Sequence, residues 1–269
     1  METLQSLPIW ILWGLGCLLL HTLSYLLSVY VLPNGPWTKL PSFTAHQVVA
    51  MPFMVYLTVL GFQEWFGGTT CADPVLHINE NGLYLSRIVI GSMLLWDIPT
   101  GFVTDGMGDP IMHFHHLGML LVSGITAGVF SSQPIGSCYA PFFFGVVELS
   151  SIPLAIVDVF HPKQKAWHDY HLTSSPLKAL NEISRIMFAL LYILVRAIYF
   201  PYVVVTQVLP EFYRATTDTD TPDTDAPALW AIMMFSLLFT GLQMYWGSLV
   251  IKQIIKALGG DGSDKTKKE

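Results

Sequence analysis

The sequence predicts an all-α fold, a polytopic membrane bundle of seven transmembrane helices, with six as the alternative. Two observations support this fold class. Hydrophobic residues make up 52% of the 269-residue chain, charged residues make up only 12%, and the mean hydropathy is +0.52. Soluble domains carry about 25% charged residues, so a soluble globular fold is excluded. The remaining charges also leave long gaps, each able to hold the roughly 20 apolar residues that a helix needs to cross a bilayer.

Hydropathy gives seven spans, which in chain order are 8–31, 43–63, 84–103, 110–131, 136–160, 182–209 and 228–253. The first span follows no basic segment and is too long for the apolar core of a secretory signal, so we expect it to be retained. Turn residues mark its end at 33–36, and Gly67-Gly68 follow the second span. Asp109-Pro110 opens the fourth span as N-cap and first helical residue. Residues 131–136 then separate the fourth span from the fifth.

Basic residues predict the orientation of the bundle, because cytoplasmic loops are enriched in Lys and Arg. Seven spans put the termini on opposite sides. Ten basic residues fall on the C-terminal side and only Arg87 and Arg214 on the other, so we expect a cytosolic C-terminus and a lumenal N-terminus. The ten are Lys39, Lys163, Lys165, Lys178, Arg185, Lys252, Lys256, Lys265, Lys267 and Lys268.

We expect three parts: an N-terminal transmembrane helix (1–34), a helical membrane domain (35–258) and a cytosolic basic tail (259–269). Lys265 and Lys267 in the tail have the form of a dilysine retrieval signal, which coat proteins bind on endoplasmic reticulum membrane proteins. A solvated basic tail near anionic lipid is the alternative. The net charge of −6 gives no reason to expect a nucleic-acid partner.

The three cysteines are scattered, so neither a disulfide framework nor a zinc site is indicated. Cys71 and Cys138 both fall on the predicted lumenal side, where they could pair. Two free thiols are the expectation.

Ionisable residues inside the spans are the strongest functional signal. A charged side chain at the bilayer centre costs about 2.5–3.5 kcal/mol on insertion scales, so such groups should face one another or a wet interior. We therefore expect the third to sixth helices to converge around a polar chamber open toward the cytoplasm. The residues concerned are Asp97, Glu148, Asp158, Arg196, His46, His113, His115 and His116.

Helical rise predicts which of these groups pair. At about 1.5 Å per residue, Glu148 and Arg196 lie about 18 and 20 Å into their spans, both near the midplane of a core about 30 Å thick. Asp97 and His116 lie about 10 and 9 Å inside the cytosolic face. We therefore expect an ion pair between Arg196 and Glu148, and we expect Asp97 to be the partner of His116.

A neutral histidine with a carboxylate behind it has the parts of a general base or nucleophile. His113 and His116 share one helix face, whereas His115 and His116 point about 100° apart. A structural polar seam between helices is the alternative interpretation. No pattern specifies a metal.

Several motifs, in this order, resemble the TLC-domain family, which includes ceramide synthases and translocating-chain-associated membrane proteins. The resemblance covers roughly 35–258. The fragments are Trp37, Ala45-His46, Leu94-Leu95-Trp96-Asp97, His115-His116-Leu117-Gly118, Glu148-Leu149-Ser150-Ser151, Phe188, Val195-Arg196, Pro201 and Leu242-Gln243-Met244-Tyr245-Trp246.

The resemblance implies an endoplasmic reticulum protein that works with lipids. In ceramide synthases a histidine pair is required for acyl transfer from acyl-CoA to a sphingoid amine, so His115 and His116 would inherit catalysis, with Asp97 orienting His116. No cofactor is implied beyond acyl-CoA as co-substrate. Residues expected to line a lipid or acyl-chain cavity are His46, His113, Glu148, Ser151, Asp158, Arg196, Gln243 and Trp246.

One departure separates the chain from the synthases. Their signature continues with His-Asp and further aspartate, whereas residues 148–153 here are Glu-Leu-Ser-Ser-Ile-Pro. This variant is more similar to the non-synthase TLC-domain proteins.

The expected function is therefore a role in membrane lipid metabolism or homeostasis, with membrane lipids as partners. An acyl-CoA-dependent N-acyltransferase and an endoplasmic reticulum cargo receptor or trafficking factor are the alternatives. A seven-helix receptor is disfavoured, because its Asp/Glu-Arg-Tyr and Asn-Pro-x-x-Tyr motifs are absent. The oligomeric state stays open.

Overall fold

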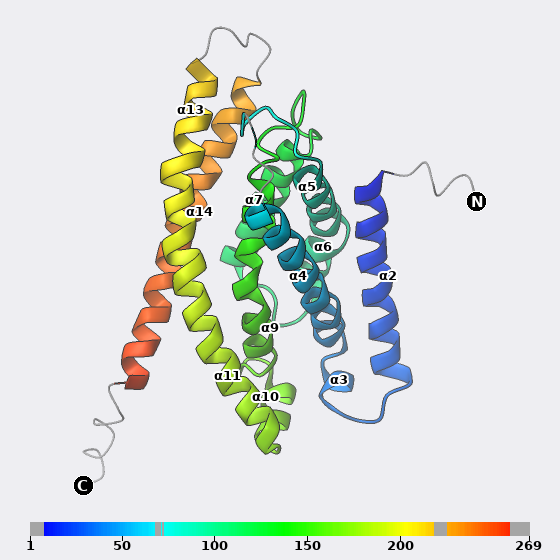
Figure 1. Cartoon of the computed structure of the whole chain (residues 1–269). Coiled ribbons are helices and arrows are strands. Elements are labelled where there is room, and N and C mark those ends of the chain that lie inside the picture. The colour runs from blue at the N-terminus through cyan, green and yellow to red at the C-terminus, as the bar shows by residue number, and fades with distance from the viewer. Residues whose placement is uncertain (1–7, 68–70, 72, 218–224, 259–269) are drawn as a thin grey trace.

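A computed structural model describes residues 8–67, 71, 73–217 and 225–258, and every regular element among them is helical. The helices form an elongated bundle (Figure 1). α2 (Ile9–Tyr30) lies along one edge, and α14 (Ala226–Leu258) lies along the opposite edge. Both run in the same direction along the bundle, as expected when the two ends of the chain emerge on opposite sides.

In the part of the chain that the structure describes, five helical segments are long and apolar enough to cross a membrane. Two of them, Ser175–Thr217 and Ala226–Ala257, pack together over much of their length. The others are Ile9–Tyr30, Pro41–Gly67 and Ala140–Val159.

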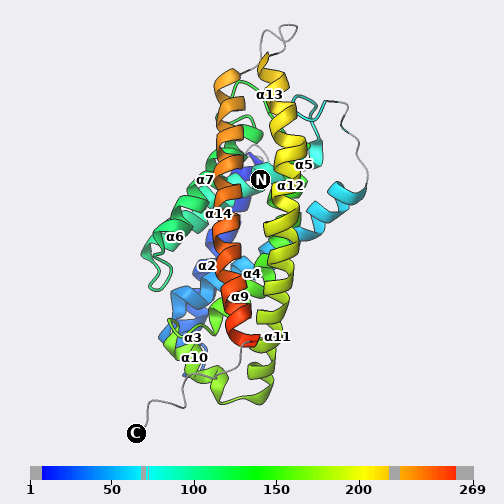
Figure 2. The ribbon, with the colours of Figure 1, turned by 90° about the vertical axis from the view of Figure 1, so that its left-hand side faces the viewer.

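Two further predicted spans are helical and lie within the bundle, although neither is among the five segments that are both long and apolar enough to cross a membrane. One is the uninterrupted run of α5 (Glu80–Ser92), η1 (Met93–Asp97) and α6 (Ile98–Val103). The other is α7 (Pro110–Thr126), 17 residues long. Figure 2 shows α6 and α7 projecting to one side of α14. The predicted all-α membrane fold is confirmed.

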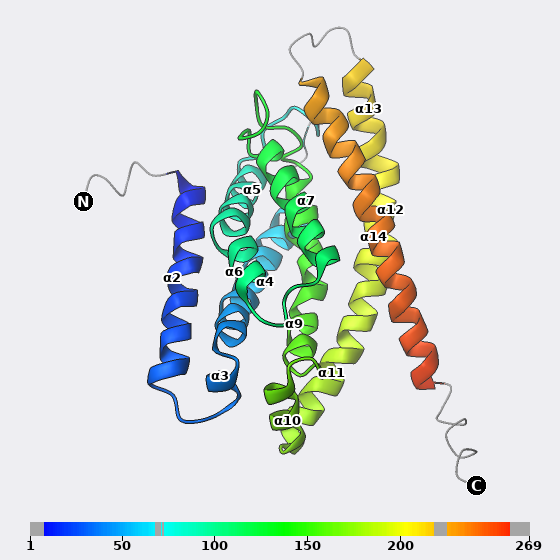
Figure 3. The same cartoon turned by 180° about the vertical axis from the view of Figure 1, so that it is seen from behind.

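The remaining segments are composite. α8 (Ala140–Phe144), the 3₁₀ turn η2 (Val146–Ser150) and α9 (Ser151–Val159) form one rod. The longest rod joins α11 (Ser175–Leu191), η3 (Tyr192–Tyr199), α12 (Phe200–Val203), η4 (Val204–Val208) and α13 (Leu209–Thr217). Short helices α3 (Pro36–Lys39) and α10 (Lys165–Leu172) pack together at the end of the bundle where α2 ends. α4 (Pro41–Gly67) follows α3 directly (Figure 3).

The predicted edges of two spans were wrong for local reasons. α7 ends at Thr126 rather than at residue 131, because Gly128 adopts φ +73° and the amides of Gly128 and Val129 bond back to the carbonyls of Ile125 and Gly124. A left-handed glycine closes a helix in this way. The sixth span, predicted as 182–209, is 43 residues long, because helix continues past the apolar segment at both ends.

Prolines explain where the long helices change their winding. The three π-helical segments end at Asp97, Tyr199 and Val208, and each is followed two residues later by a proline: Pro99, Pro201 and Pro210. Proline lacks an N–H and its ring clashes with the carbonyl four residues back, so the turn before it widens. Such π-bulges are frequent at functional sites.

Among the described residues, three buried apolar clusters hold the bundle together, the smallest of them around Phe43, Val159 and Phe160. The first joins α2, α4, α5 and α8 through residues such as Cys17, Phe53, Leu85 and Phe144. The second joins the end of α7, α8 and the α12–α14 region around Phe142.

Cys71 and Cys138 form a disulfide, so the expectation of two free thiols was wrong. The bond links the loop before α5 to the loop before α8, and their Cα atoms are 6.4 Å apart. The sequence placed both residues on one side of the membrane but gave no measure of how close the two loops come.

Candidate functional site

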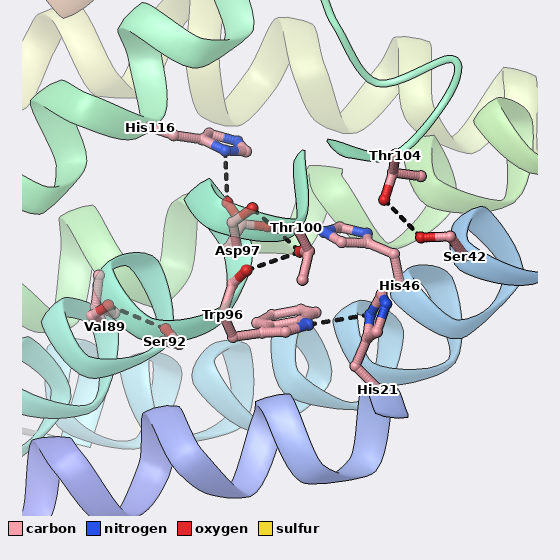
Figure 4. Close-up of polar contacts among 10 residues, drawn as sticks. All are labelled: His21, Ser42, His46, Val89, Ser92, Trp96, Asp97, Thr100, Thr104 and His116. Carbon is pink, nitrogen blue, oxygen red and sulfur yellow. Dashed lines mark hydrogen bonds and ion pairs between the residues drawn. The ribbon is translucent and has the colours of Figure 1, made fainter. Parts of the chain in front are cut away.

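Asp97 lies at the centre of the site and is held by two histidines from different helices. Its Oδ1 is 2.9 Å from Nε2 of His46 on α4, in a buried hydrogen bond. Its Oδ2 is 2.5 Å from Nδ1 of His116 on α7. Figure 4 shows His116 approaching the carboxylate from the side opposite His46. The expected pairing of His116 with Asp97 is confirmed, and His46 is an additional partner.

The two contacts with Asp97 differ in kind. The His46 contact has hydrogen-bond geometry, whereas Nδ1 of His116 approaches Oδ2 closely but at angles outside hydrogen-bond geometry. With Nδ1 turned to the carboxylate, Nε2 of His116 lies on the opposite side of the ring. His116 also lines the large cavity described below.

Backbone structure places Asp97 in this position. Asp97 is the last residue of η1, the π segment before Pro99. Thr100, one turn later, bonds its hydroxyl to the carbonyl of Trp96 at 2.7 Å. The side chains of Asp97 and Trp96 therefore both project from the same widened π turn.

Trp96 connects the carboxylate site to α2. Its indole stacks on the ring of His46, with centroids 4.9 Å apart. Its Nε1 donates to Nδ1 of His21 on α2 at 3.3 Å. His21 and Trp96 are both buried. Nothing in the sequence singles out His21, because a lone histidine in an apolar first helix has no partner that spacing can predict.

Arg196 forms a second polar group nearer α9. Its Nε donates to Ser150 Oγ and one terminal nitrogen donates to Ser151 Oγ, both at 2.7 Å. The same terminal nitrogen lies 3.6 Å from Glu148 Oε2. The expected pairing of Arg196 with Glu148 is confirmed, but the serine hydroxyls make the shorter contacts. Arg196 belongs to the π segment η3.

A cavity of about 440 Å³ lies between the two polar groups. Apolar side chains form most of its wall, and His46, Asp97, His115, His116, Glu148, Ser151, Asp158, Arg196 and Trp246 also line it. A narrower pocket of about 40 Å³ adjoins it and shares His115, Glu148 and Arg196 as lining residues.

The remaining candidates lie around these spaces. Gln243 is buried, lines the smaller pocket and accepts a hydrogen bond from the Tyr192 hydroxyl at 2.8 Å. Asp158 lines the larger cavity and is itself exposed near the end of α9. His113 lines neither space, because its ring stacks on Phe102 with centroids 4.3 Å apart.

His115 faces away from the carboxylate. Its ring contacts Phe239 and Trp246 of α14, with centroids 5.2 and 5.7 Å away. It therefore lies between the larger cavity and the smaller pocket, while its neighbour His116 contacts Asp97. Within the described residues, no group of three or more His, Cys, Asp or Glu side chains is arranged to hold a metal ion.

The fold and the site together define a multi-pass helical membrane protein with paired ionisable groups enclosed in its interior. The family model of the TLC domain (TRAM_LAG1_CLN8) matches residues 15–252. The chain belongs to this family. No curated protein and no solved structure matches the chain.

Proposed function

We propose that this TLC-domain protein binds a membrane lipid in its interior and acts in membrane lipid metabolism or homeostasis. One observation carries the proposal: a mostly apolar cavity of about 440 Å³ that ends at the paired groups of Asp97 and Arg196. Ligand sites typically enclose about 300–1,000 Å³, with apolar walls and a few polar groups that fix orientation. An acyl chain suits the walls, and the polar part of the lipid suits the histidines and Arg196.

Two features support an orientation with the C-terminus in the cytosol. The basic residues are concentrated on that side, as the positive-inside rule requires. The Cys71–Cys138 disulfide lies at the other end, and disulfides persist in oxidising compartments such as the endoplasmic reticulum lumen. We place the protein in the endoplasmic reticulum, where coat proteins would bind the tail at Lys265 and Lys267. The tail lies outside the described residues.

Lipid retention tests the proposed function. The protein is purified in nanodiscs, stripped of bulk lipid with mild detergent and extracted, and retained lipid per protein is measured by mass spectrometry. Ala50→Phe fills the wall of the cavity, whereas Val48→Phe, two residues away on α4, changes a side chain that is 53% exposed. We expect retained lipid to fall in Ala50→Phe and to stay at the wild-type level in Val48→Phe.

A second cavity variant keeps the test informative if Ala50→Phe does not fold. Leu154→Phe fills the opposite wall from α9. Full lipid retention in a monodisperse cavity variant would contradict the proposal.

The arrangement of His46, Asp97 and His116 also favours a second candidate, an acyl-CoA-dependent N-acyltransferase. A carboxylate that fixes one ring nitrogen leaves the other to act as a base, the arrangement used in general acid–base catalysis. The amine would attack the thioester carbonyl, His116 would take its proton, and the coenzyme thiolate would leave and be protonated. Acyl transfer by purified wild type, compared with His115→Ala and His116→Ala, tests this candidate. Equal inactivity of all three would remove it.

A further inference from the structure

Two helices separate along one side of the cavity. α14 packs along α13, η4, η3 and α7, but over the described residues of both helices it makes no extensive contact with α11. Figures 1 and 3 show α14 diverging from α11 toward the end of the bundle where α10 lies. The bundle is therefore incomplete on this side.

The cavity reaches the surface at this divergence. Phe188 of α11 lines the cavity on one side of the gap, and Trp246, Leu249 and Val250 of α14 line it on the other. Leu249 is also 40% exposed, although it lines the cavity. A side chain of the cavity wall is thus accessible here, and the rim is apolar.

The surface around the rim is suited to hydrocarbon. Ile186 and Leu190 on α11 and Ile255 on α14 are each more than half exposed. Lys252, one turn beyond Leu249, is also exposed. Lysine near the end of a membrane helix extends its ammonium group to the interface. The rim therefore lies just inside the hydrocarbon region, below the headgroups.

The other approach to the cavity has different chemistry. Asp158 lines the cavity near the end of α9 and is exposed there. A charged, hydrated group in that position is an unfavourable neighbour for a bare acyl chain. An apolar chain arriving from the bilayer meets no such charge between α11 and α14.

We propose that the gap between α11 and α14, bounded by Phe188, Leu249 and Val250, is a lateral portal through which a membrane-resident lipid passes its acyl chain into the cavity. The lipid comes from the leaflet next to α10, which is the cytosolic leaflet in the orientation given above. This inference rests on the proposed lipid-binding function and specifies where the lipid comes from.

Loading kinetics test the portal. The protein is reconstituted in vesicles, and a phosphatidylcholine with a diazirine on its acyl chain is added from donor vesicles. Photolysis at successive times, followed by peptide mapping, measures label on cavity peptides. Leu249→Trp narrows the portal, whereas Ile255→Trp adds the same bulk to a residue of α14 that does not line the cavity. We expect Leu249→Trp to slow loading about tenfold, a change equivalent to about 1.4 kcal/mol in the barrier. Each rate is taken relative to the variant's own final labelling, so that lost cavity volume is not read as slow entry, and Ile255→Trp should load like wild type.

A variant that widens the portal gives an independent measurement of the loading rate if Leu249→Trp does not fold. Phe188→Ala removes bulk from the opposite rim and should speed loading. Wild-type loading rates in both rim variants would overturn the portal while leaving the proposed function intact. If wild-type cavity peptides acquire no label even at long times, the proposed function fails and the portal fails with it.

Discussion

Asp97 shows how this chain tolerates a carboxylate among apolar helices. Its two oxygens meet His46 and His116, which come from helices on either side of it. Arg196 is compensated in the same way by Glu148 and two serine hydroxyls. The polar groups around Asp97 and Arg196 are both explained by the high cost of an isolated charge in a low-dielectric interior.

The Arg196 group predicts unequal effects of removing its two charges. Arg196→Met leaves Glu148, whose side chain is 15% exposed, without its cation, and the cost should approach the figure of about 3–5 kcal/mol for breaking a fully buried pair. Glu148→Gln should cost less, because Arg196 keeps its two contacts of 2.7 Å to serine. The double variant should be more stable than the sum of the single effects predicts. Thermal unfolding in detergent measures all three, and strict additivity would count against the pairing.

His21 predicts a structural link from α2 to the site. His21→Ala removes the acceptor of the Trp96 N–H, and an unsatisfied buried donor costs about 1–3 kcal/mol. Thr22→Ala is the matched control, because the Thr22 hydroxyl bonds only the Leu18 carbonyl of its own helix on an exposed face. Thermal unfolding should show a lower stability for His21→Ala than for Thr22→Ala. Equal stability would mean that the 3.3 Å contact contributes nothing.

The sequence predicted the paired charges but not their supporting residues. Asp97, His116, Glu148 and Arg196 could be matched by depth, because charge is costly in hydrocarbon and helical rise is regular. The serine contacts of Arg196 depend on the exact register of a π segment, and periodicity does not resolve that register. His113 was grouped with His116 by spacing, but its ring stacks on Phe102 instead.

At the scale of helices, proline positions locate the site better than hydropathy does. Asp97 and Arg196 both lie in π segments that end two residues before a proline. The prolines were visible in the sequence, but their effect on helix winding was not used to place these side chains. Span edges were predicted less well, because hydropathy does not detect polar helix that continues beyond the apolar segment.

The packing of α2 gives a prediction with an internal control. A Cβ on Gly14 would meet the carbonyl oxygen of Gly91 and the side chain of Leu95, whereas a Cβ on Gly16 meets nothing within 4 Å. Small residues allow membrane helices to approach closely. Gly14→Ala should therefore cost about 1–3 kcal/mol through overpacking, and Gly16→Ala should be neutral. If thermal unfolding finds both variants equally stable, α2 does not pack as described.

At the scale of the whole molecule, the Cys71–Cys138 disulfide holds the loops before α5 and α8 together. It also indicates that these loops lie in an oxidising compartment. Closing a loop with a sequence separation of 67 residues contributes about 4 kcal/mol in the chain-entropy treatment. Cys71→Ser should lower stability by that order, whereas Cys17→Ser should affect only local packing. Peptide mapping without reductant should recover Cys71 linked to Cys138. Alkylation of Cys71 and Cys138 as well as the free Cys17, in protein taken directly from membranes and denatured, would contradict the proposed lumenal placement.

The fold as a whole groups the ionisable side chains inside the bundle, next to one cavity. Hydropathy predicted the helices, and the cost of buried charge predicted that the third to sixth would bring their polar residues together. The separation of α11 from α14 was not predicted, because composition does not determine the angle at which two apolar helices cross.

The most direct test of the lipid-binding account is a cryo-electron microscopy map of the protein in lipid nanodiscs. The account predicts elongated density that runs from the gap beside Leu249 into the cavity and ends within hydrogen-bonding distance of His116 or Arg196. A map in which side chains close the cavity, with lipid density confined to the outside of the bundle, would contradict it.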